Sequence, residues 1–347
     1  MDSESKDLSH ENSDKEIIKK YKHGICKLKK IVDVSIYLLV IILIISGIIF
    51  LIYIREKLSS NKIYIADLSK ITTNFNETYK NFNNYNCSFI QEKLNFRIKP
   101  FEFKEELIFI IGLIQCKIPF SFIRFGDGEK SIMKGESFGS KKDKWHWDYK
   151  NKIFQYSLIE SSTICNNYLF YNSFIGIPCS NIANSIYSFS NCSSSKFLSY
   201  SSLFINKNFE LFKYWIFGFI NSKNRWKIIL VANSNININI DWVYKFFPIP
   251  NNIVEKWNYY NQPLLSKLSE QAKYNNLIFF ISAGPAANII VSYLSKINNK
   301  NIYIDFGSSI EFITKGYSTR GYYNMNSETS KLGCGTFILK NKKLIYE

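Results

Sequence analysis

The longest apolar run of the chain lies near its beginning, over residues 34–54, where only Ser35, Ser46 and Gly47 interrupt it mildly. At about 1.5 Å per residue, a helix of this length spans the hydrocarbon layer of a bilayer, which is roughly 30 Å thick. A cleaved signal peptide is the alternative, but its apolar core is usually about 7–15 residues and a small-residue cleavage site follows it. Here the run is longer and continues into Arg55 without such a site, so we predict a retained transmembrane anchor.

The charges on both sides of this segment predict its orientation. Six lysines precede it with no acid among them: Lys19, Lys20, Lys22, Lys27, Lys29 and Lys30. The cations after it, Arg55, Lys57 and Lys62, are offset in part by Glu56. Because the more positive side stays in the cytoplasm, residues 1–33 are predicted to be a cytoplasmic tail, disordered in its polar first part. The rest of this single-pass membrane protein is expected outside the cell or in a lumen of the ER or Golgi type.

The pattern of apolar and polar residues changes twice beyond the anchor. Residues 55–98 are mixed, polar and weakly periodic, which is typical of a stem. The folded domain is predicted over residues 99–347 and begins with a helix at about 103–115. Its apolar positions recur at helical spacing at Leu107, Ile110, Ile111 and Ile114.

Short apolar runs in this domain predict strands. They cover residues 120–125, 168–176, 227–232, 277–281 and 302–306. These runs do not alternate with polar residues, and helical stretches separate them, one of which contains Leu158 and Ile159. This is the pattern of an α/β protein with a parallel sheet covered by helices on both faces, here preceded by the single transmembrane helix. Residues 182–225 are rich in Ser, Asn and aromatic side chains, and our hypothesis is that they form helices lining an acceptor site.

The most informative motif is the hexapeptide Arg124-Phe-Gly-Asp-Gly-Glu129, which directly follows an apolar run. In an extended segment residues i and i+2 point to one side, so Asp127 and Glu129 are expected to face the same ligand. Gly126 and Gly128 let the backbone turn and come close to that ligand. Oxygen ligands with open positions suit a divalent cation that carries a diphosphate. The competing interpretation is a tight Asp-Gly turn with solvated acids.

A second candidate ligand site lies where the run 277–281 meets the next helix. Gly284 follows the strand, and Pro285 is expected at the first helical position, where its missing N–H costs nothing. Ala286 and Ala287 are small enough for a ligand to reach exposed amides, and helix N-termini attract phosphate. Ligands of open α/β sheets collect at the carboxyl ends of strands, although an ordinary strand–turn–helix corner is the alternative. In either case the inward face of this helix is predicted to comprise Ile289, Ile290, Tyr293 and Leu294.

Further charged residues have two interpretations each. Arg124 is expected either to contact phosphate and stabilise leaving-group charge or to pair with an acid of its own motif. Asp305 lies at the end of a predicted strand and either binds ligand or caps the next segment. Arg320 is either a clamp for sugar or phosphate or a partner in a structural ion pair. His146, the only histidine after the anchor, is either a general base or a packing residue.

The charge balance of the chain favours an acidic ligand. Lys and Arg number 44 against 28 Asp and Glu, which leaves a formal net charge of +16. A nucleotide diphosphate is helped by this surplus. No basic stretch is interleaved with stacking aromatic residues, so nucleic acid is not predicted as a partner.

Cysteines are concentrated after the anchor, at Cys87, Cys116, Cys165, Cys179, Cys192 and Cys334. Six cysteines would permit three disulfides in an oxidising lumen, with the connectivity left open. None forms a Cys-x-x-Cys pair and the chain has only 3 histidines, so a zinc site is not predicted. Cys116 and Cys179 have apolar neighbours in sequence and are predicted to be plain core thiols.

Taken together, these motifs resemble those of the GT-D type glycosyltransferases, which carry an Asp-x-Glu motif inside Arg-[Phe/Tyr]-Gly-Asp-Gly-Glu. The resemblance covers roughly residues 100–340. Its matching segments follow in order at residues 121–129, 175–178, 228–231, 249–252, 284–287, 304–308 and 319–322, with Cys334 behind them. It implies a Rossmann-like sheet, a nucleotide-diphosphate sugar donor that is usually UDP-linked, Mn²⁺ or Mg²⁺ as cofactor, and a glycan or glycoprotein acceptor.

The resemblance also implies roles for individual residues. Glu129 is expected to be a direct metal ligand, and Asp127 a partner to the nucleotide or the metal. The catalytic set is then Arg124, Asp127 and Glu129, and the donor-binding set is Gly126, Gly128, Gly284, Pro285, Ala286 and Asp305. Two features depart from the family: its members are commonly soluble bacterial enzymes without an anchor, and Glu311 stands where many of them have Asp.

Two hypotheses from other classes stay open. In one, the domain is a non-catalytic, membrane-anchored module that binds a glycan or a nucleotide. In the other, it is a membrane-tethered structural or virion-type protein whose basic surface holds an anionic partner. The intact Asp-x-Glu motif argues against both, because clustered acids are costly to keep without a function.

Overall fold

The computed structural model describes most of the chain beyond residue 85. The described residues are 43, 45–48, 86–140, 145–166, 172–179, 183–190, 192, 194–222, 226–236, 240–316, 320–323, 328–335, 337–340 and 343–346. The chain divides into two compact units, Met1–Thr73 and Asn74–Glu347.

The predicted tail at 1–33 and most of the predicted stem lie outside the described residues. So does the predicted anchor at 34–54, apart from Leu43 and residues 45–48, which are helical. In the described part of the chain, no helix has both the length and the apolar character needed to cross a bilayer.

The second unit is built on a seven-stranded sheet in which all neighbouring strands are parallel. Their spatial order is β5–β4–β1–β9–β8–β6–β7. The strands are β1 (Phe120–Arg124), β4 (Ser173–Ile177), β5 (Leu198–Tyr200), β6 (Lys227–Asn233), β7 (Lys245–Ile249), β8 (Leu277–Ile281) and β9 (Ile302–Asp305). Two small antiparallel hairpins lie outside this sheet, β2 (Phe138–Ser140) with β3 (Trp145–Trp147) and β10 (Phe337–Lys340) with β11 (Lys343–Tyr346). The prediction of an α/β protein with a parallel sheet is therefore confirmed.

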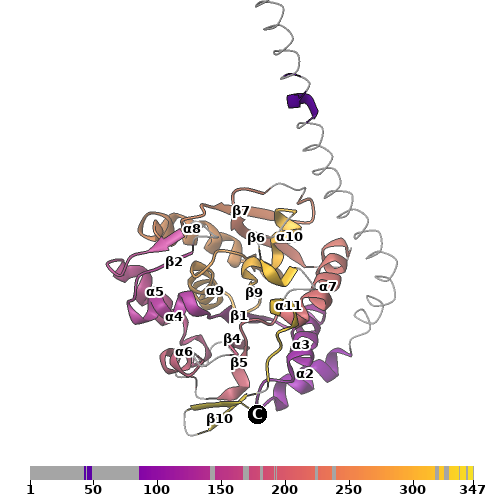
Figure 1. Cartoon of the computed structure of the whole chain (residues 1–347). Helices are drawn as coiled ribbons and strands as arrows, with labels where there is room; N and C mark the ends of the chain where they lie inside the picture. The colour runs from indigo at the N-terminus through magenta and orange to yellow at the C-terminus, as the bar shows by residue number, and fades with distance from the viewer. Residues whose placement is uncertain are drawn as a thin grey trace, which may run out of the picture. The chain divides into compact units, whose positions relative to one another are not determined.

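Helices cover both faces of the sheet. Figure 1 shows α4, α5, α8 and α9 on one side of the sheet, and α3 and α7 on the other. The helices of this unit are α2 (Cys87–Phe96), α3 (Phe103–Gln115), α4 (Asp127–Lys134), α5 (Lys152–Ser161), α6 (Ala183–Ser190), α7 (Phe209–Asn221), α8 (Trp257–Ala272), α9 (Ala286–Ile297), α10 (Glu311–Thr314) and α11 (Glu328–Lys331). Helix α9 contacts β1, β9, α5 and α8 and is therefore central to its layer.

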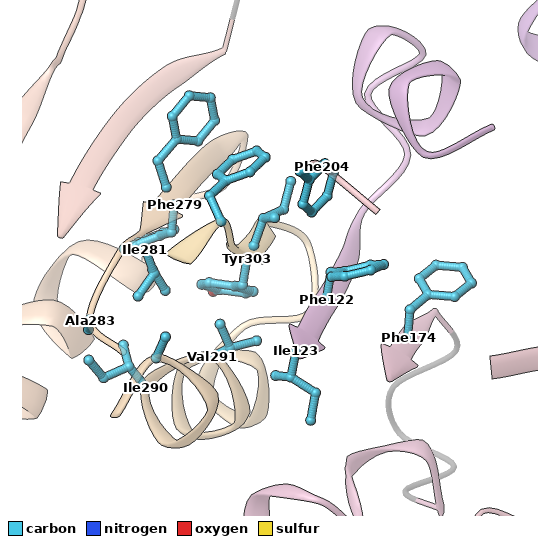
Figure 2. Close-up of a cluster of buried hydrophobic side chains, with 14 of the residues drawn as sticks. Phe122, Ile123, Phe174, Phe204, Phe279, Ile281, Ala283, Ile290, Val291 and Tyr303 are labelled. Atoms are coloured by element: carbon cyan, nitrogen blue, oxygen red, sulfur yellow. The ribbon is translucent and has the colours of Figure 1, made fainter. Parts of the chain in front are cut away.

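Alternate residues of the central strands pack against opposite helical layers. Ile123 of β1 lies on the α9 side of the strand near Val291, whereas the neighbouring Phe122 lies on the other face against Phe204 (Figure 2), with 5.3 Å between the two ring centroids. All of these side chains are buried. Because neither face of the strand meets water, both can be apolar, and the run shows no alternation.

Two strands of the seven-stranded sheet have no counterpart among the predicted ones, and both lie at its edges. β5 is only three residues long, and β7 contains Pro248, which has no N–H to donate and is tolerated only at an edge. By contrast, α3 and β8 have the predicted bounds, because both combine long apolar character with clear ends. Residues 182–225 contain the helices α6 and α7, as hypothesised, together with β5.

Six cysteines form three disulfides, Cys87–Cys116, Cys165–Cys192 and Cys179–Cys334. The prediction that Cys116 and Cys179 are core thiols is therefore wrong: their apolar neighbours in sequence do not reveal that a second cysteine from elsewhere in the chain lies beside each of them. Disulfides persist mainly in oxidising compartments.

The disulfide that closes the longest loop is expected to stabilise the fold most. Replacing Cys179 and Cys334 together by serine should lower the free energy of unfolding by about 5 kcal/mol, against about 3 to 4 kcal/mol for Cys165 and Cys192, since the loops span 155 and 27 residues. Denaturant unfolding of the two double variants measures both losses. A larger loss from the shorter loop would contradict this ranking.

Candidate functional site

The carboxyl ends of β1 and β9 bring two opposite charges together at one edge of the sheet. Arg124 is the last residue of β1, Asp305 is the last residue of β9, and the two strands are neighbours. Nε of Arg124 lies 3.3 Å from Oδ2 of Asp305, and the two side chains are 14% and 6% exposed. Parallel strands end at the same edge, which explains how residues so distant in sequence meet.

Arg124 is held by its backbone as well as by its side chain. Its N–H donates to Oδ1 of Asn288 at 3.0 Å, and Nδ2 of Asn288 donates to the Arg124 carbonyl at 2.7 Å. Asn288 is fully buried on α9. The guanidinium also donates from Nη1 to the carbonyl of Ser201, just beyond β5, at 3.1 Å. Three segments therefore fix the position of this cation.

Gly307 lies directly against the ion pair. Its φ is +51°, and its N–H donates to Oδ1 of Asp305 at 2.8 Å. A Cβ atom at this position would collide with Nη2 of Arg124. Both the left-handed backbone and the close approach require glycine.

Glu129 reaches the same edge from helix α4, which begins at Asp127. Oε2 of Glu129 accepts a hydrogen bond of 2.9 Å from the N–H of Gly126, the residue before the helix. Glu129 thus makes one half of a capping box, and Gly126 cannot make the other half because it has no side chain.

The expectation that Asp127 and Glu129 share one side of an extended segment is wrong, because the chain is already helical at Asp127. Residues two apart on a helix point in directions about 200° apart. Asp127 is exposed, whereas Glu129 is half-buried and folds back toward Gly126.

Burial makes the two inner carboxyls hard to ionise. Desolvation is the main cause that raises the pKa of Glu129 to about 7, and the charge of Asp305 raises it further, while backbone N–H groups and Arg124 oppose the shift. Burial likewise raises the pKa of Asp305, against the lowering effect of Arg124 and the Gly307 N–H. With both acids ionised, these three side chains carry two negative charges and one positive charge. The cluster is therefore suited to take up a proton or a cation.

The donor set fits a divalent metal ion only in part. In the described residues, no three His, Cys, Asp or Glu side chains form a group that could hold a metal. Glu129 and Asp305 offer hard carboxylate oxygens, and Mg²⁺ commonly takes one or two carboxylates plus phosphate oxygens of a substrate. These two acids therefore fit a cation that arrives with a diphosphate.

The glycines and alanines of the predicted donor-binding set have packing roles in this fold. A Cβ on Gly128 would lie 3.0 Å from the ring of Phe138. Gly284 has a φ of +55°, and Pro285 precedes α9 as its N-cap and is not its first helical residue. Ala286 is fully buried. Close packing at Gly128 and Ala286 and the left-handed backbone at Gly284 account for these small residues.

Two further residues of α9, Ala287 and Tyr293, differ from their predictions. The N–H of Ala287, expected to be free for a ligand, donates to the carbonyl of Gly284 at 2.9 Å. Tyr293, predicted to face inward, is 39% exposed, whereas Ile289, Ile290 and Leu294 are buried as predicted.

Other candidate residues lie apart from the acid–arginine cluster or contribute through structure. His146 is exposed on β3, and its backbone N–H donates to Oε1 of Glu255 at 2.8 Å. Glu311 forms an ion pair with Lys315 at 2.8 Å. Asn288 was not predicted to contribute to the site. The signal that could have identified it is an asparagine on the otherwise apolar, inward face of a helix.

Fold and site together define an α/β protein with a parallel sheet and a buried acid–arginine cluster at its carboxyl edge. No protein-family model and no curated protein matches the chain. Two solved structures are similar to it, each at 17% identity and a TM-score of 0.43. One is a selenomethionine-substituted domain of unknown function 1792 (72% of this chain, 94% of that one). The other is the highly conserved domain of unknown function 1792, said to have a distinct glycosyltransferase fold (70% of this chain, 93% of that one).

Glu129 is expected to make stability depend on pH. Its folded pKa of about 7 lies above the ordinary value of 4.5. The stability that its protonated form contributes is therefore fully present below pH 4.5 and is lost as the pH rises through 7. Glu129→Gln keeps an oxygen for the Gly126 N–H but does not titrate, so it should gain about 2 kcal/mol relative to wild type between pH 5 and 8.

Urea unfolding in the presence of a chelator measures this difference. Glu136→Gln, which changes an exposed acid just beyond the same helix, is the matched control. A constant difference between Glu129→Gln and wild type over this pH range would show that burial does not hold the carboxyl protonated.

Asn288→Ala is expected to lower the free energy of unfolding by about 2–4 kcal/mol, because it leaves the N–H and carbonyl of Arg124 without their buried partner. The control on the same helix is Lys296→Ala, which breaks an exposed ion pair with Glu160 and should cost under about 1 kcal/mol. Urea unfolding compares the two, and equal losses would contradict the anchoring role of Asn288.

Proposed function

We propose that this protein is a metal-dependent glycosyltransferase that moves a sugar from a nucleotide-diphosphate donor, a UDP-sugar in the first instance, to a glycan or glycoprotein acceptor. The observation that carries the proposal is the pair of desolvated carboxyls, the half-buried Glu129 and the buried Asp305, beside Arg124 at the carboxyl edge of a parallel sheet. This edge is where open α/β sheets bind their ligands.

The charge of the cluster supports a ligand that brings a cation. Glu129 and Asp305 repel one another and Arg124 compensates only one of them. A Mn²⁺ or Mg²⁺ ion supplied with a diphosphate would lower the pKa of both acids and relieve this repulsion. In this proposal Glu129 is a metal ligand, Asp305 stands beside it, and the exposed Asp127 on the same helical turn binds the metal or the nucleotide. The bound ion would supply charge stabilisation for the departing diphosphate.

In this proposal Arg124 and the N-terminus of α9 both stabilise negative charge on the diphosphate. The guanidinium, fixed from three segments, presents positive charge close to the site where leaving-group charge would develop. The turn Gly284-Pro285-Ala286 places the N-terminus of α9 at the same edge, where the helix dipole favours phosphate. A Cβ on Gly126 would lie 3.3 Å from Oε2 of Glu129, and one on Gly128 would lie 3.0 Å from the ring of Phe138, so both glycines leave room beside these side chains.

The proposed location is a secretory-pathway or exterior compartment, with residues 34–54 in the lipid bilayer and the N-terminus in the cytoplasm. The three disulfides support this location, because an oxidising compartment maintains them.

A non-catalytic glycan- or nucleotide-binding module is the second candidate function. It is favoured by one observation, which is that both carboxyls already have partners within the protein. Glu129 accepts from the Gly126 N–H, and Asp305 pairs with Arg124 and accepts from the Gly307 N–H. Such satisfied acids could serve only to hold the loop.

Release of nucleoside diphosphate from a panel of nucleotide sugars distinguishes the two functions. Full-length protein with Mn²⁺ should release UDP from at least one donor, and a chelator should abolish the release. Glu129→Gln should lower the rate roughly 10²–10³-fold, since it removes a charge that acts on the developing diphosphate. Asp127→Asn should also lower it, whereas Glu136→Gln should leave it unchanged.

The alternatives give different results in the same assay. Equal rates for wild type and Glu129→Gln would exclude the proposed role of Glu129. Tight UDP binding without turnover of any donor would favour the binding module.

A further inference from the structure

A cavity lies at the edge of the sheet opposite the acid–arginine cluster. Its volume is about 610 Å³, and it opens beside Lys227 and Leu277, the first residues of β6 and β8. The cluster lies at the carboxyl ends of β1 and β9, so the parallel strands separate the two sites. The volume falls within the range of roughly 300–1,000 Å³ that is usual for small-ligand sites.

Two tyrosines from different segments give this cavity aromatic walls. Tyr244 precedes β7 and is 59% exposed, and Tyr274 follows α8 and is 66% exposed. Trp226 also lines the cavity, is 3% exposed and donates from Nε1–H to the Ile114 carbonyl at 3.2 Å. A fixed indole and two accessible rings suit a flat ligand with an apolar face.

The polar lining supplies neutral amides and positive charge. Asn275 and Asn276 are exposed, and an asparagine amide offers both a donor and an acceptor. Lys117 and Lys227 also line the cavity, and Nζ of Lys227 lies 4.8 Å from the ring centroid of Tyr244. No acid occurs among the described residues that line it. The cavity is therefore complementary to an anion.

We propose that this cavity binds an anionic saccharide, that is, a sugar carrying a carboxylate, sulfate or phosphate group. The apolar face of the sugar ring stacks on Tyr244 or Tyr274, its hydroxyls bond to the two asparagines, and its anionic group lies near the lysines. A nucleotide would share the stacking and the charge, but the paired amides favour hydroxyls, each of which both donates and accepts. The site is separate from the proposed donor site and does not depend on the transferase activity.

Titration calorimetry of the full-length protein, in a detergent without a sugar headgroup, tests the proposal. The probes are a heparin-derived hexasaccharide, uncharged maltohexaose and UDP. The charged saccharide should bind at least about 10-fold more tightly than the neutral one. Tyr274→Ala and Lys117→Ala should each weaken its binding about 10-fold, while the melting temperature stays close to that of wild type.

Three control variants separate this cavity from the rest of the molecule. Tyr259→Ala removes a tyrosine of α8 that is 83% exposed, Lys296→Ala removes an exposed lysine of α9, and Glu129→Gln changes the proposed donor site. None of them should alter saccharide binding. Absence of saccharide binding, an equal loss in Tyr259→Ala or Lys296→Ala, or tighter binding of UDP that Lys117→Ala weakens would each overturn the proposal.

Discussion

The carboxyl edge of the sheet depends on the buried ion pair between Arg124 and Asp305. A charge removed from water needs partners, and here the polypeptide supplies them from several elements. Asp305 and the Ser201 carbonyl satisfy the guanidinium, and Asn288 on α9 pairs with the backbone of the same arginine. Gly307 has no side chain where one would displace the cation. The end of β1 is thereby fixed relative to α9 and β9.

This arrangement also explains the unusual chemistry of Glu129. Arg124 forms its ion pair with Asp305, so the half-buried carboxyl of Glu129 has no equivalent counter-charge among the described residues. Its pKa rises toward neutrality as a result of burial and of the neighbouring acid. The opposite edge has the reverse character, with lysines and tyrosines around a cavity that has no acid among its described lining residues. The two edges of one parallel sheet are thus suited to ligands of different charge, a cation at one and an anion at the other.

Much of the fold was predictable because the central strands are buried on both faces. Complete burial demands continuous apolar runs, and β8 and α3 accordingly have their predicted bounds. The edge strand β7 was missed because it contains a proline and is only partly buried. In the motif, the two glycines indicated a turn, but not that the helix would begin as early as Asp127. Local composition permits both a turn and a helix there, and the contact between Gly128 and Phe138 of the β2–β3 hairpin forms only in the folded protein.

The sequence by itself determined the parallel α/β architecture and the placing of Arg124 and Asp305 at strand ends, because these follow from local apolar pattern. Only the tertiary structure decided which charges meet. Arg124 pairs with Asp305 and with neither acid of its own motif, since strand order makes β1 and β9 neighbours while α4 turns Asp127 toward solvent. The same holds for the disulfides, whose partners are as far apart as Cys179 and Cys334. Pairings across the chain depend on topology, and no local pattern of residues encodes them.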